Sequence, residues 1–216
     1  MLPFIALEGC DGSGKTTVRN IICRQLEEDG IQCKRIGQHS WLNPRDSRLI
    51  VRLRDQKCRP GNAAISSAYA SDKFAHGRFN VEPLLGHSVV IADRWIYSDA
   101  VYHSVLYGID MAETLQRHKI QQTILPELVI YVSTTVTEAY KRVISRGRQT
   151  RHYERPSDLR EISKAYEVLF AGLIGTAERV LRFSNDPSDV NTRVRDFIMP
   201  VIRELIDKRA HPTGYE

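Results

Sequence analysis

Short apolar runs alternate with longer amphipathic segments along the whole chain. Five runs have the length and composition of buried strands, and they cover residues 3–7, 32–36, 88–92, 128–132 and 180–183. Apolar residues at helical spacing predict helices over 15–29, 46–56, 62–80, 97–107, 110–121, 135–146, 157–178 and 188–207. This alternation predicts an α/β fold, a doubly wound five-stranded parallel sheet with helices on both faces, whose ligands bind beyond the carboxyl ends of the strands.

The first predicted strand leads into a segment with the spacing of a phosphate-binding loop. Gly9, Gly14, Lys15 and Thr16 occupy the fixed positions of the motif G-x-x-x-x-G-K-[ST], and a segment of helical spacing follows them. In such a loop the glycines turn backbone N–H groups toward phosphate, the lysine brings a charge to the β and γ phosphates, and the threonine hydroxyl is a ligand for Mg²⁺. The loop predicts a nucleotide site made by Gly9, Asp11, Gly12, Ser13, Gly14, Lys15, Thr16 and Thr17.

The third predicted strand ends in a second pair of charged residues. Asp93 follows four apolar residues, so its carboxylate is expected at the carboxyl end of a strand, where it can hold Mg²⁺ through water while Arg94 faces the phosphates. A buried aspartate that caps the next helix is the alternative. Together with the phosphate loop, the pattern favours a metal site at Thr16 and Asp93.

Six segments occur in the order and at the spacing of one known family. They read "FIALEGCDGSGKTT", "YASDKFAH", "DRWIYSDAVYH", "PELVIYVS", "RGRQTRHYE" and "AYEVLF". Over most of residues 3–170 the chain resembles the thymidylate kinase family of nucleoside monophosphate kinases. The resemblance implies a P-loop kinase fold with a lid, and transfer of the γ-phosphoryl group of ATP–Mg²⁺ to dTMP or a related pyrimidine or modified deoxynucleotide. It also implies a homodimer.

The resemblance assigns the sugar and phosphate of the acceptor to three residues. Asp11 would meet the 3′-hydroxyl, and this is reasonable because a carboxylate in a phosphate loop is tolerable when it accepts a hydrogen bond from a hydroxyl. Arg94 would bind the phosphate of the acceptor. Tyr102 would crowd the 2′ position of the sugar and so favour deoxynucleotides, although a core aromatic residue on a helix is the alternative.

The resemblance assigns the base of the acceptor to three further residues, and here the chain departs from the family pattern. Tyr69 would stack on the base, with a core aromatic residue again the alternative, and His103 takes the place of a frequent glutamine. Lys73 stands where the family usually has an arginine, so bidentate reading of a base edge is compromised. "GQHSWLNPRD" follows Ile36 where the family usually has Arg-Glu-Pro and glycines. An acceptor other than ordinary dTMP is therefore an open expectation.

The segment over about 146–157 resembles the lid of the family. In members whose phosphate loop lacks an arginine after the acidic residue, the lid supplies the catalytic arginines, and here Gly12 follows the loop aspartate while Arg146, Arg148 and Arg151 populate the lid. Arg151 matches the family position best, and Arg146 comes next. The expected catalytic residues are Lys15, Arg94, Arg146 and Arg151.

The composition adds a basic balance, with a net charge of +5 and a pI of about 9.1. Basic residues concentrate at 45–59 and 141–155, where they either close over a triphosphate or form a solvated face. No recognised nucleic-acid module accompanies this charge, so nucleic acid is not an expected partner. A kinase of a nucleoside or another small alcohol, with Glu8 or Asp93 as general base, is the main alternative; a nucleotide-binding regulatory protein or a nucleic-acid-binding protein is the other.

The length of 216 residues suits one P-loop kinase domain over 1–208, followed by a flexible tail at 209–216. Apolar runs all fall short of a membrane span and the first residues do not resemble a signal peptide, so a cytoplasmic protein without a membrane partner is expected. The four cysteines lack metal-ligand spacing and are expected to be ordinary thiols. They are Cys10, Cys23, Cys33 and Cys58.

Overall fold

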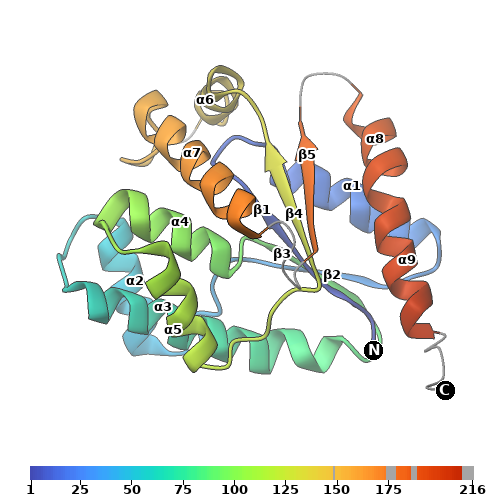
Figure 1. Ribbon diagram of the computed structural model, residues 1–216, viewed down its shortest axis with the longest axis horizontal. Coiled ribbons are helices and arrows are strands. Elements are labelled where there is room, and N and C mark those ends of the chain that lie inside the picture. Colours follow the sequence, from blue (N-terminus) through green and yellow to red (C-terminus); the bar gives the residue numbers. More distant parts are fainter. Residues whose placement is uncertain (148, 174–178, 186–188, 211–216) are drawn as a thin grey trace.

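A computed structural model describes residues 1–147, 149–173, 179–185 and 189–210. Its centre is one parallel sheet in the strand order β2-β3-β1-β4-β5 (Figure 1). The strands are β1 (Phe4–Glu8), β2 (Cys33–Ile36), β3 (Val89–Asp93), β4 (Leu128–Ser133) and β5 (Arg179–Ser184). All five predicted strands are confirmed, as is the predicted α/β class.

Helices cover both faces of the sheet. In Figure 1, α1, α8 and α9 lie on one side and α4 and α7 on the other. The α-helices are α1 (Lys15–Glu28), α2 (Pro44–Arg54), α3 (Asn62–His76), α4 (Ile96–Tyr107), α5 (Met111–Ile120), α6 (Val136–Ile144), α7 (Pro156–Leu173), α8 (Val190–Arg193) and α9 (Met199–Ala210). Side chains cap the first turns of α5 and α6, where Asp110 accepts from the Ala112 N–H and Thr135 accepts from the Glu138 N–H.

Two predicted helices are interrupted. The helix expected over 62–80 ends at His76 and continues as a π-helical segment, Gly77–Val81. Gly77 lies against Ile124 so closely that a Cβ atom would be 2.7 Å from its Cγ2. The helix expected over 188–207 has a π-helical segment, Val194–Ile198, just before Pro200, which has no N–H to continue the ladder. Residues 174–178 and 188 of the predicted helices lie outside the described residues, as do 211–216 of the predicted tail.

Alternate side chains of β1 enter two separate cores. Phe4 and Ala6 pack in a cluster with side chains of α4 and α7, while Ile5 and Leu7 pack in a cluster with side chains of α1 and α9. Fully burying an aliphatic or aromatic side chain contributes about 1.5–3 kcal/mol. A strand that is buried on both faces is the normal centre of a parallel sheet with helices on each side.

The register of the central strands sets the position of the candidate site. Leu7 of β1 lies opposite Asp93 of β3, and both strands run in the same direction. The phosphate loop that follows β1 and the residues that follow Asp93 therefore leave the sheet side by side at its carboxyl edge. Ligands of open α/β sheets bind at this edge.

The expectation of four ordinary thiols is wrong for one pair of cysteines. Cys23 of α1 and Cys33 of β2 form a disulfide, with their Cα atoms 5.4 Å apart. Gly30, at a φ of 78°, reverses the chain between the helix and the strand and brings two residues ten positions apart together. Cys10 and Cys58 are free.

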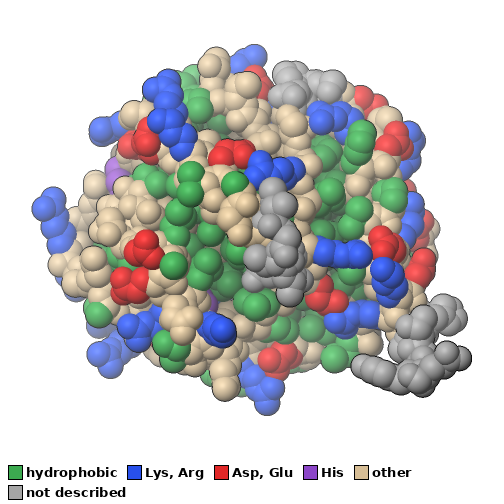
Figure 2. All heavy atoms as spheres, in the orientation of Figure 1, with side chains coloured by type: hydrophobic (Ala, Val, Ile, Leu, Met, Phe, Trp, Pro, Cys, Tyr) green, Lys and Arg blue, Asp and Glu red, His purple; other side chains and the backbone are tan. Residues whose placement is uncertain are grey.

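The surface carries charges of both signs. On the face shown in Figure 2, Lys and Arg side chains are scattered among Asp, Glu, hydrophobic and other side chains and do not merge into one basic area. Many of the exposed arginines are paired, as in the ion pair of 2.7 Å between Arg203 and Asp29. Within the described ranges, no helix has the length and apolar character that crossing a bilayer requires.

Candidate active site

The phosphate loop joins β1 to α1 and requires glycine at two positions. Gly12 and Gly14 have φ angles of 81° and 92°, in the left-handed region. A Cβ atom on Gly12 would lie 2.1 Å from the carbonyl oxygen of Ala139, and one on Gly14 would lie 2.0 Å from Nδ2 of Asn185. Both the local backbone and the packing of the loop against α6 and the end of β5 therefore exclude a side chain.

The ammonium of Lys15 lies inside the loop, where its Nζ donates to the carbonyl oxygens of Gly9 and Cys10 at 3.0 and 2.9 Å. Burial, together with the nearby Arg94 guanidinium, lowers the pKa of Lys15 to about 8. An anion in the loop would restore the charge balance around these two cations. This is the electrostatic character expected of a phosphate site.

A first cavity, the donor cavity, opens above the loop. It is lined by Asp11, Gly12, Gly14, Lys15, Thr16, Thr17, Asp93, Arg94, Arg142 and Arg146. Of the eight residues predicted for the nucleotide site, six are on this wall. The other two are Gly9, which contributes its carbonyl oxygen behind the wall, and Ser13, which is fully buried.

Arg142 of α6 was not predicted as a site residue. Its guanidinium donates to the carbonyl oxygens of Ser13 at 3.4 Å and Asn185 at 3.2 Å, and its Nε donates to Glu138 at 2.8 Å. The Asn185 side chain also donates to the Ser13 carbonyl, at 2.7 Å. In the sequence this arginine is only one of many in a basic helix, and its contact with the loop depends on how α6 packs.

Thr16 and Asp93 meet at the floor of the donor cavity, as predicted from the sequence. The Thr16 hydroxyl donates to Oδ2 of Asp93 at 2.9 Å, and Arg19 lies 3.6 Å from the same oxygen. Among the described residues there is no group of three or more His, Cys, Asp or Glu side chains that could hold a metal. Two hard oxygen donors beside a phosphate loop nevertheless fit Mg²⁺, which keeps several water and phosphate ligands and needs few from the protein.

Arg94 begins the segment after β3 with a φ of 79°, a left-handed conformation that is uncommon for a residue with a side chain. Its Nη1 donates to the Gly9 carbonyl at 2.8 Å, and its Nη2 lies 3.2 Å from Oδ2 of Asp11 and 2.9 Å from the Tyr102 hydroxyl. The Tyr102 hydroxyl in turn donates to Asp11 at 2.6 Å. The three side chains form a closed, buried triangle of polar contacts.

The charges of this triangle are set by their neighbours. Burial alone would raise the pKa of Asp11, but the Arg94 guanidinium and the Lys15 ammonium hold it well below its ordinary value. Burial raises the pKa of Tyr102 well above its ordinary value. Asp11 is therefore a carboxylate and Tyr102 a protonated hydroxyl at neutral pH, so the direction of the hydrogen bond between them is fixed.

A buried carboxyl group supports Arg94 from behind. Glu8 accepts from the Trp95 N–H at 2.8 Å, from Ser98 and from the Tyr166 hydroxyl at 3.2 Å, and both hydroxyls also contact the Arg94 guanidinium. Burial raises the pKa of Glu8 to about 7. Glu8 is fully buried and does not line the donor cavity, so its contacts are with the scaffold of the site.

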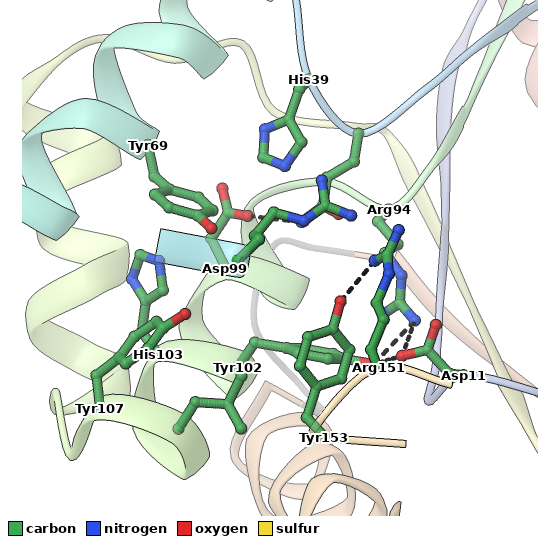
Figure 3. A pocket seen from close by; sticks show the side chains of 13 residues that line it. Asp11, His39, Tyr69, Arg94, Asp99, Tyr102, His103, Tyr107, Arg151 and Tyr153 are labelled. Atoms are coloured by element: carbon green, nitrogen blue, oxygen red, sulfur yellow. Dashed lines mark hydrogen bonds and ion pairs between the residues drawn. The ribbon is translucent and has the colours of Figure 1, made fainter. Parts of the chain in front are cut away.

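A second cavity, the acceptor cavity, adjoins the donor cavity, and Asp11 and Arg94 line both. It is lined by Asp11, Gln38, His39, Arg54, Tyr69, Arg94, Asp99, Tyr102, His103, Leu106, Tyr107, Arg151 and Tyr153. In Figure 3, Tyr69, His103 and Tyr107 lie on one side, and Arg94, Arg151 and Asp11 on the other. The rings of Tyr69 and His103 meet edge to face at 4.5 Å.

Five of the six residues predicted for the acceptor are on this wall, and the sixth, Lys73, is not. Lys73 is fully buried, and its ammonium donates to the Gln38 carbonyl at 2.6 Å and lies 3.2 Å from Asp99. Through these two contacts Lys73 ties the segment after β2 to Asp99 of α4. This contact could not be predicted from the sequence, because Asp99 lies on a different helix.

The segment after β2, where the chain departs from the family pattern, is organised by Asp72 of α3. The Asp72 carboxylate accepts from the backbone N–H groups of Ser40 and Trp41, from the Ser40 hydroxyl at 2.6 Å, and contacts Nδ1 of His39 at 3.1 Å. These contacts place His39 and Gln38 on the cavity wall. Neither residue was predicted as a site residue, although the departure itself was noticed.

Arginines of the predicted lid line both cavities. Arg146 lines the donor cavity and lies 3.9 Å from Glu154, whereas Arg151 lines the acceptor cavity and donates through Nη1 to the Tyr153 hydroxyl at 2.5 Å. The backbone N–H of Arg151 donates to the same Glu154 carboxylate at 2.7 Å. Arg148, the third arginine of the predicted lid, lies outside the described residues.

Three further wall residues of the acceptor cavity were not predicted as site residues from the sequence. Arg54 ends α2, Tyr107 ends α4, and Tyr153 lies in the lid. The only available signal was their proximity in the chain to motifs already identified, such as Tyr107 four residues after His103 and thus on the same face of a helix. Their convergence depends on the packing of three separate segments.

Comparison with known proteins identifies the family of this chain. The model of the family described as thymidylate kinase matches residues 7–178. A probable thymidylate kinase of Methanococcus aeolicus is 28% identical over 214 residues, which cover 97% of this chain and 98% of the relative. The thymidylate kinase of Desulfotalea psychrophila is 26% identical over 200 residues, which cover 92% of this chain and 93% of the relative. A probable thymidylate kinase of Archaeoglobus fulgidus is 29% identical over 165 residues, which cover 76% of this chain and 80% of the relative. The chain belongs to the thymidylate kinase family.

Proposed function

We propose that the protein transfers the γ-phosphoryl group of ATP to dTMP, or to a related pyrimidine or modified deoxynucleotide, and releases the diphosphate. One observation carries the proposal: the donor and acceptor cavities share the residues Asp11 and Arg94. Direct transfer requires both nucleotides to reach one point in line, and the shared residues mark such a point. The names of the relatives support dTMP as the first acceptor to test.

The residues around that point supply charge and position. Lys15 neutralises the β and γ phosphates, and Arg94 holds the phosphate of the acceptor at the junction of the two cavities. Arg146 approaches from the donor side and Arg151 from the acceptor side. Phosphoryl transfer needs little covalent help from the protein, so fixed cations that meet the developing charge provide most of the catalysis.

Thr16 and Asp93 would hold Mg²⁺ in the donor cavity, Thr16 through its hydroxyl and Asp93 through water. When bound, the ion supplies neutralisation and orientation of the β and γ phosphates. Arg19, which lies 3.6 Å from the Asp93 carboxylate, pairs with that carboxylate and helps to hold it in place.

The acceptor sugar would lie beside Asp11 and the ring of Tyr102. As a carboxylate, Asp11 can accept a hydrogen bond from a 3′-hydroxyl. The Tyr102 ring, whose hydroxyl is fixed on Asp11 and Arg94, leaves no room for a 2′-hydroxyl and so favours deoxynucleotides. Tyr69 and His103 would enclose the base on the opposite side of the cavity.

The alternative kinase of a nucleoside or other alcohol gains no support from the geometry. It needs a general base within reach of the hydroxyl, and of its two candidates Glu8 lies behind Arg94 while Asp93 is engaged with Thr16. A nucleic-acid-binding role also gains no support, since the basic side chains on the visible face are dispersed (Figure 2).

The assembly and location of the protein are part of the same proposal. Family resemblance favours a homodimer, which sedimentation or size-exclusion chromatography with light scattering will test. ATP and nucleoside monophosphates are metabolites of the cytoplasm, so that compartment is where the proposed reaction finds its substrates.

A coupled ATP-consumption assay tests the activity directly. It screens all ribonucleoside and deoxyribonucleoside monophosphates together with the corresponding nucleosides. We expect turnover with a deoxypyrimidine monophosphate, none with nucleosides, and a loss of at least about 10³-fold in Lys15→Ala, which removes the cation at the phosphates. Turnover of a nucleoside in preference to its monophosphate would contradict the proposal.

A further inference from the structure

One wall of the acceptor cavity carries an imidazole whose outer nitrogen is unused. The His39 side chain is 2% exposed, and its Nδ1 lies 3.1 Å from Oδ2 of Asp72. Its Nε2 has no hydrogen-bond partner among the described residues, although His39 lines the cavity (Figure 3). A buried polar atom without a partner costs stability, and such atoms in a cavity wall are expected to meet a ligand.

The contact with Asp72 fixes the tautomer of the His39 ring. Burial alone would raise the pKa of Asp72, but its hydrogen bond with His39 and the nearby Lys73 ammonium lower it, so this group is a carboxylate that can only accept. The proton therefore lies on Nδ1. Burial lowers the pKa of His39 to about 4, so at neutral pH the ring has a single N–H and Nε2 presents a lone pair to the cavity.

The position of this lone pair is also fixed. The Asp72 carboxylate that binds His39 binds the next two backbone N–H groups as well, those of Ser40 and Trp41. One residue earlier, the buried Lys73 ammonium holds the Gln38 carbonyl. The segment is thus pinned on both sides of His39, and its imidazole is a preorganised hydrogen-bond acceptor.

A second imidazole, that of His103, lies on the other side of the Tyr69 ring and also has unused hydrogen-bonding groups. His103 is 1% exposed, and in the described part of the chain neither of its nitrogens has a hydrogen-bond partner. Burial lowers its pKa to about 4, so it too is neutral and offers one N–H and one lone pair. The ring of Tyr69 lies between the two, 5.4 Å from His39 and 4.5 Å from His103.

We propose that His39 determines the base specificity of the acceptor site by accepting a hydrogen bond from the N3–H of a thymine or uracil ring. The inference rests on the proposed function and deepens it. An imide edge presents an N–H between its two carbonyls, and this N–H matches the fixed acceptor at Nε2 of His39. Cytosine has a lone pair at N3, which would face the lone pair of His39 Nε2.

This assignment gives the departure from the family pattern a purpose. Lys73, at the position where the family usually has an arginine, is buried beneath the cavity and reads no base edge. Its role is to hold the segment that carries His39, and the imidazole of His39 recognises the base in its place. A modified base that retains N3–H, such as one altered at C5, satisfies the same contact.

Binding and turnover of matched ligands test the inference. Isothermal titration measures the affinities of dTMP, N3-methyl-dTMP and dCMP for the wild type and for His39→Leu, His39→Gln and His87→Gln. His87 is an exposed histidine before β3, at the opposite end of that strand from the site, and serves as the control. The same variants are assayed for turnover with saturating ATP.

We expect the wild type to bind dTMP roughly tenfold to hundredfold more tightly than N3-methyl-dTMP or dCMP, because a methyl group or a lone pair at N3 leaves His39 unpaired. His39→Leu weakens dTMP about tenfold and brings dTMP and N3-methyl-dTMP to within about threefold of one another. It raises the KM for dTMP and leaves the KM for ATP unchanged. His39→Gln, whose amide carbonyl can replace Nε2 as an acceptor, retains most of the preference, and His87→Gln retains all of it.

Other outcomes overturn the inference in distinguishable ways. Equal wild-type affinity for dTMP and N3-methyl-dTMP, or an unchanged ratio in His39→Leu, removes His39 from base recognition while turnover with dTMP leaves the proposed function standing. Preference for dCMP assigns Nε2 to an exocyclic amine and overturns the imide assignment. No turnover with any nucleoside monophosphate overturns the proposed function itself. If His39→Leu does not fold, the wild-type ligand ratios and His39→Gln decide.

Discussion

Replacing Glu8 with glutamine removes a carboxyl group that burial makes costly to ionise. The pKa of Glu8 is raised from 4.5 to about 7, so the folded state holds this proton more tightly than the unfolded state does. Below about pH 4.5 the group is protonated in both states and costs nothing. As the pH rises toward 7, the unfolded chain releases the proton first, and the folded state is progressively disfavoured. The cost is complete above pH 7.

The size of the effect follows from the same two values. At about 1.4 kcal/mol for each tenfold difference in proton affinity, the rise from 4.5 to about 7 corresponds to roughly 3 kcal/mol of unfolding free energy. Glutamine keeps the shape of the side chain, an acceptor for the Trp95 N–H and a donor for Ser98 or Tyr166, so the neutral contacts survive. Glu8→Gln should therefore gain about 3 kcal/mol over the wild type between pH 4.5 and pH 8.

Urea unfolding of both proteins at several pH values measures this difference. Subtracting the wild-type value from that of Glu8→Gln at each pH cancels the titration of all other groups. Glu113→Gln, which replaces an exposed carboxylate on α5, is the matched control and should show no change of comparable size. A difference between Glu8→Gln and the wild type that stays constant from pH 4.5 to pH 8 would refute the reasoning, because Glu8 would then ionise as readily in the folded protein as in the unfolded chain.

Three further predictions concern the cavities and the lid. Tyr102→Ala should lower the preference for dTMP over its ribonucleotide counterpart by about tenfold or more, because the space beside C2′ opens. The preference is measured as a ratio of kcat/KM values, and an unchanged ratio would place the sugar elsewhere. Arg146→Ala should reduce kcat by roughly 10³-fold or more, the scale of a missing arginine finger. Arg151→Ala should instead act mainly on the KM for the acceptor. Indistinguishable kinetics for the two variants would contradict their separate placement. Tryptic cleavage after Arg146 and Arg151 should slow when dTMP and a non-hydrolysable ATP analogue are bound together, and a rate that saturating ligands leave unchanged would argue against a closing lid.

The sheet and the phosphate loop could be predicted from the sequence because their signals are local. The strand expected over 128–132 appears as Leu128–Ser133, an apolar run that reports burial on both faces wherever the rest of the chain goes. The glycines of the loop are likewise required by its own backbone angles. A pattern that a short segment determines by itself can be recognised in that segment.

Features that depend on distant partners could not be predicted in the same way. The helix expected over 62–80 becomes π-helical at Gly77, which packs against Ile124, and the disulfide of Cys23 depends on a turn that returns the chain to the same helix. Lys73 was assigned to the base by its position in a motif, but its ammonium faces Asp99. His39 was visible only as part of an unfamiliar segment, since its importance comes from Asp72 more than thirty residues later.

The contact between Arg94 and Asp11 has a consequence for what the site admits. Before any nucleotide binds, the guanidinium that is proposed to hold the acceptor phosphate is already neutralised by a carboxylate 3.2 Å away. An incoming molecule must offer a stronger anion to draw the guanidinium away. A nucleoside or a water molecule offers none, whereas a phosphate monoester brings up to two negative charges. We therefore expect the resting ion pair to favour phosphate monoesters over uncharged alcohols at the junction of the two cavities.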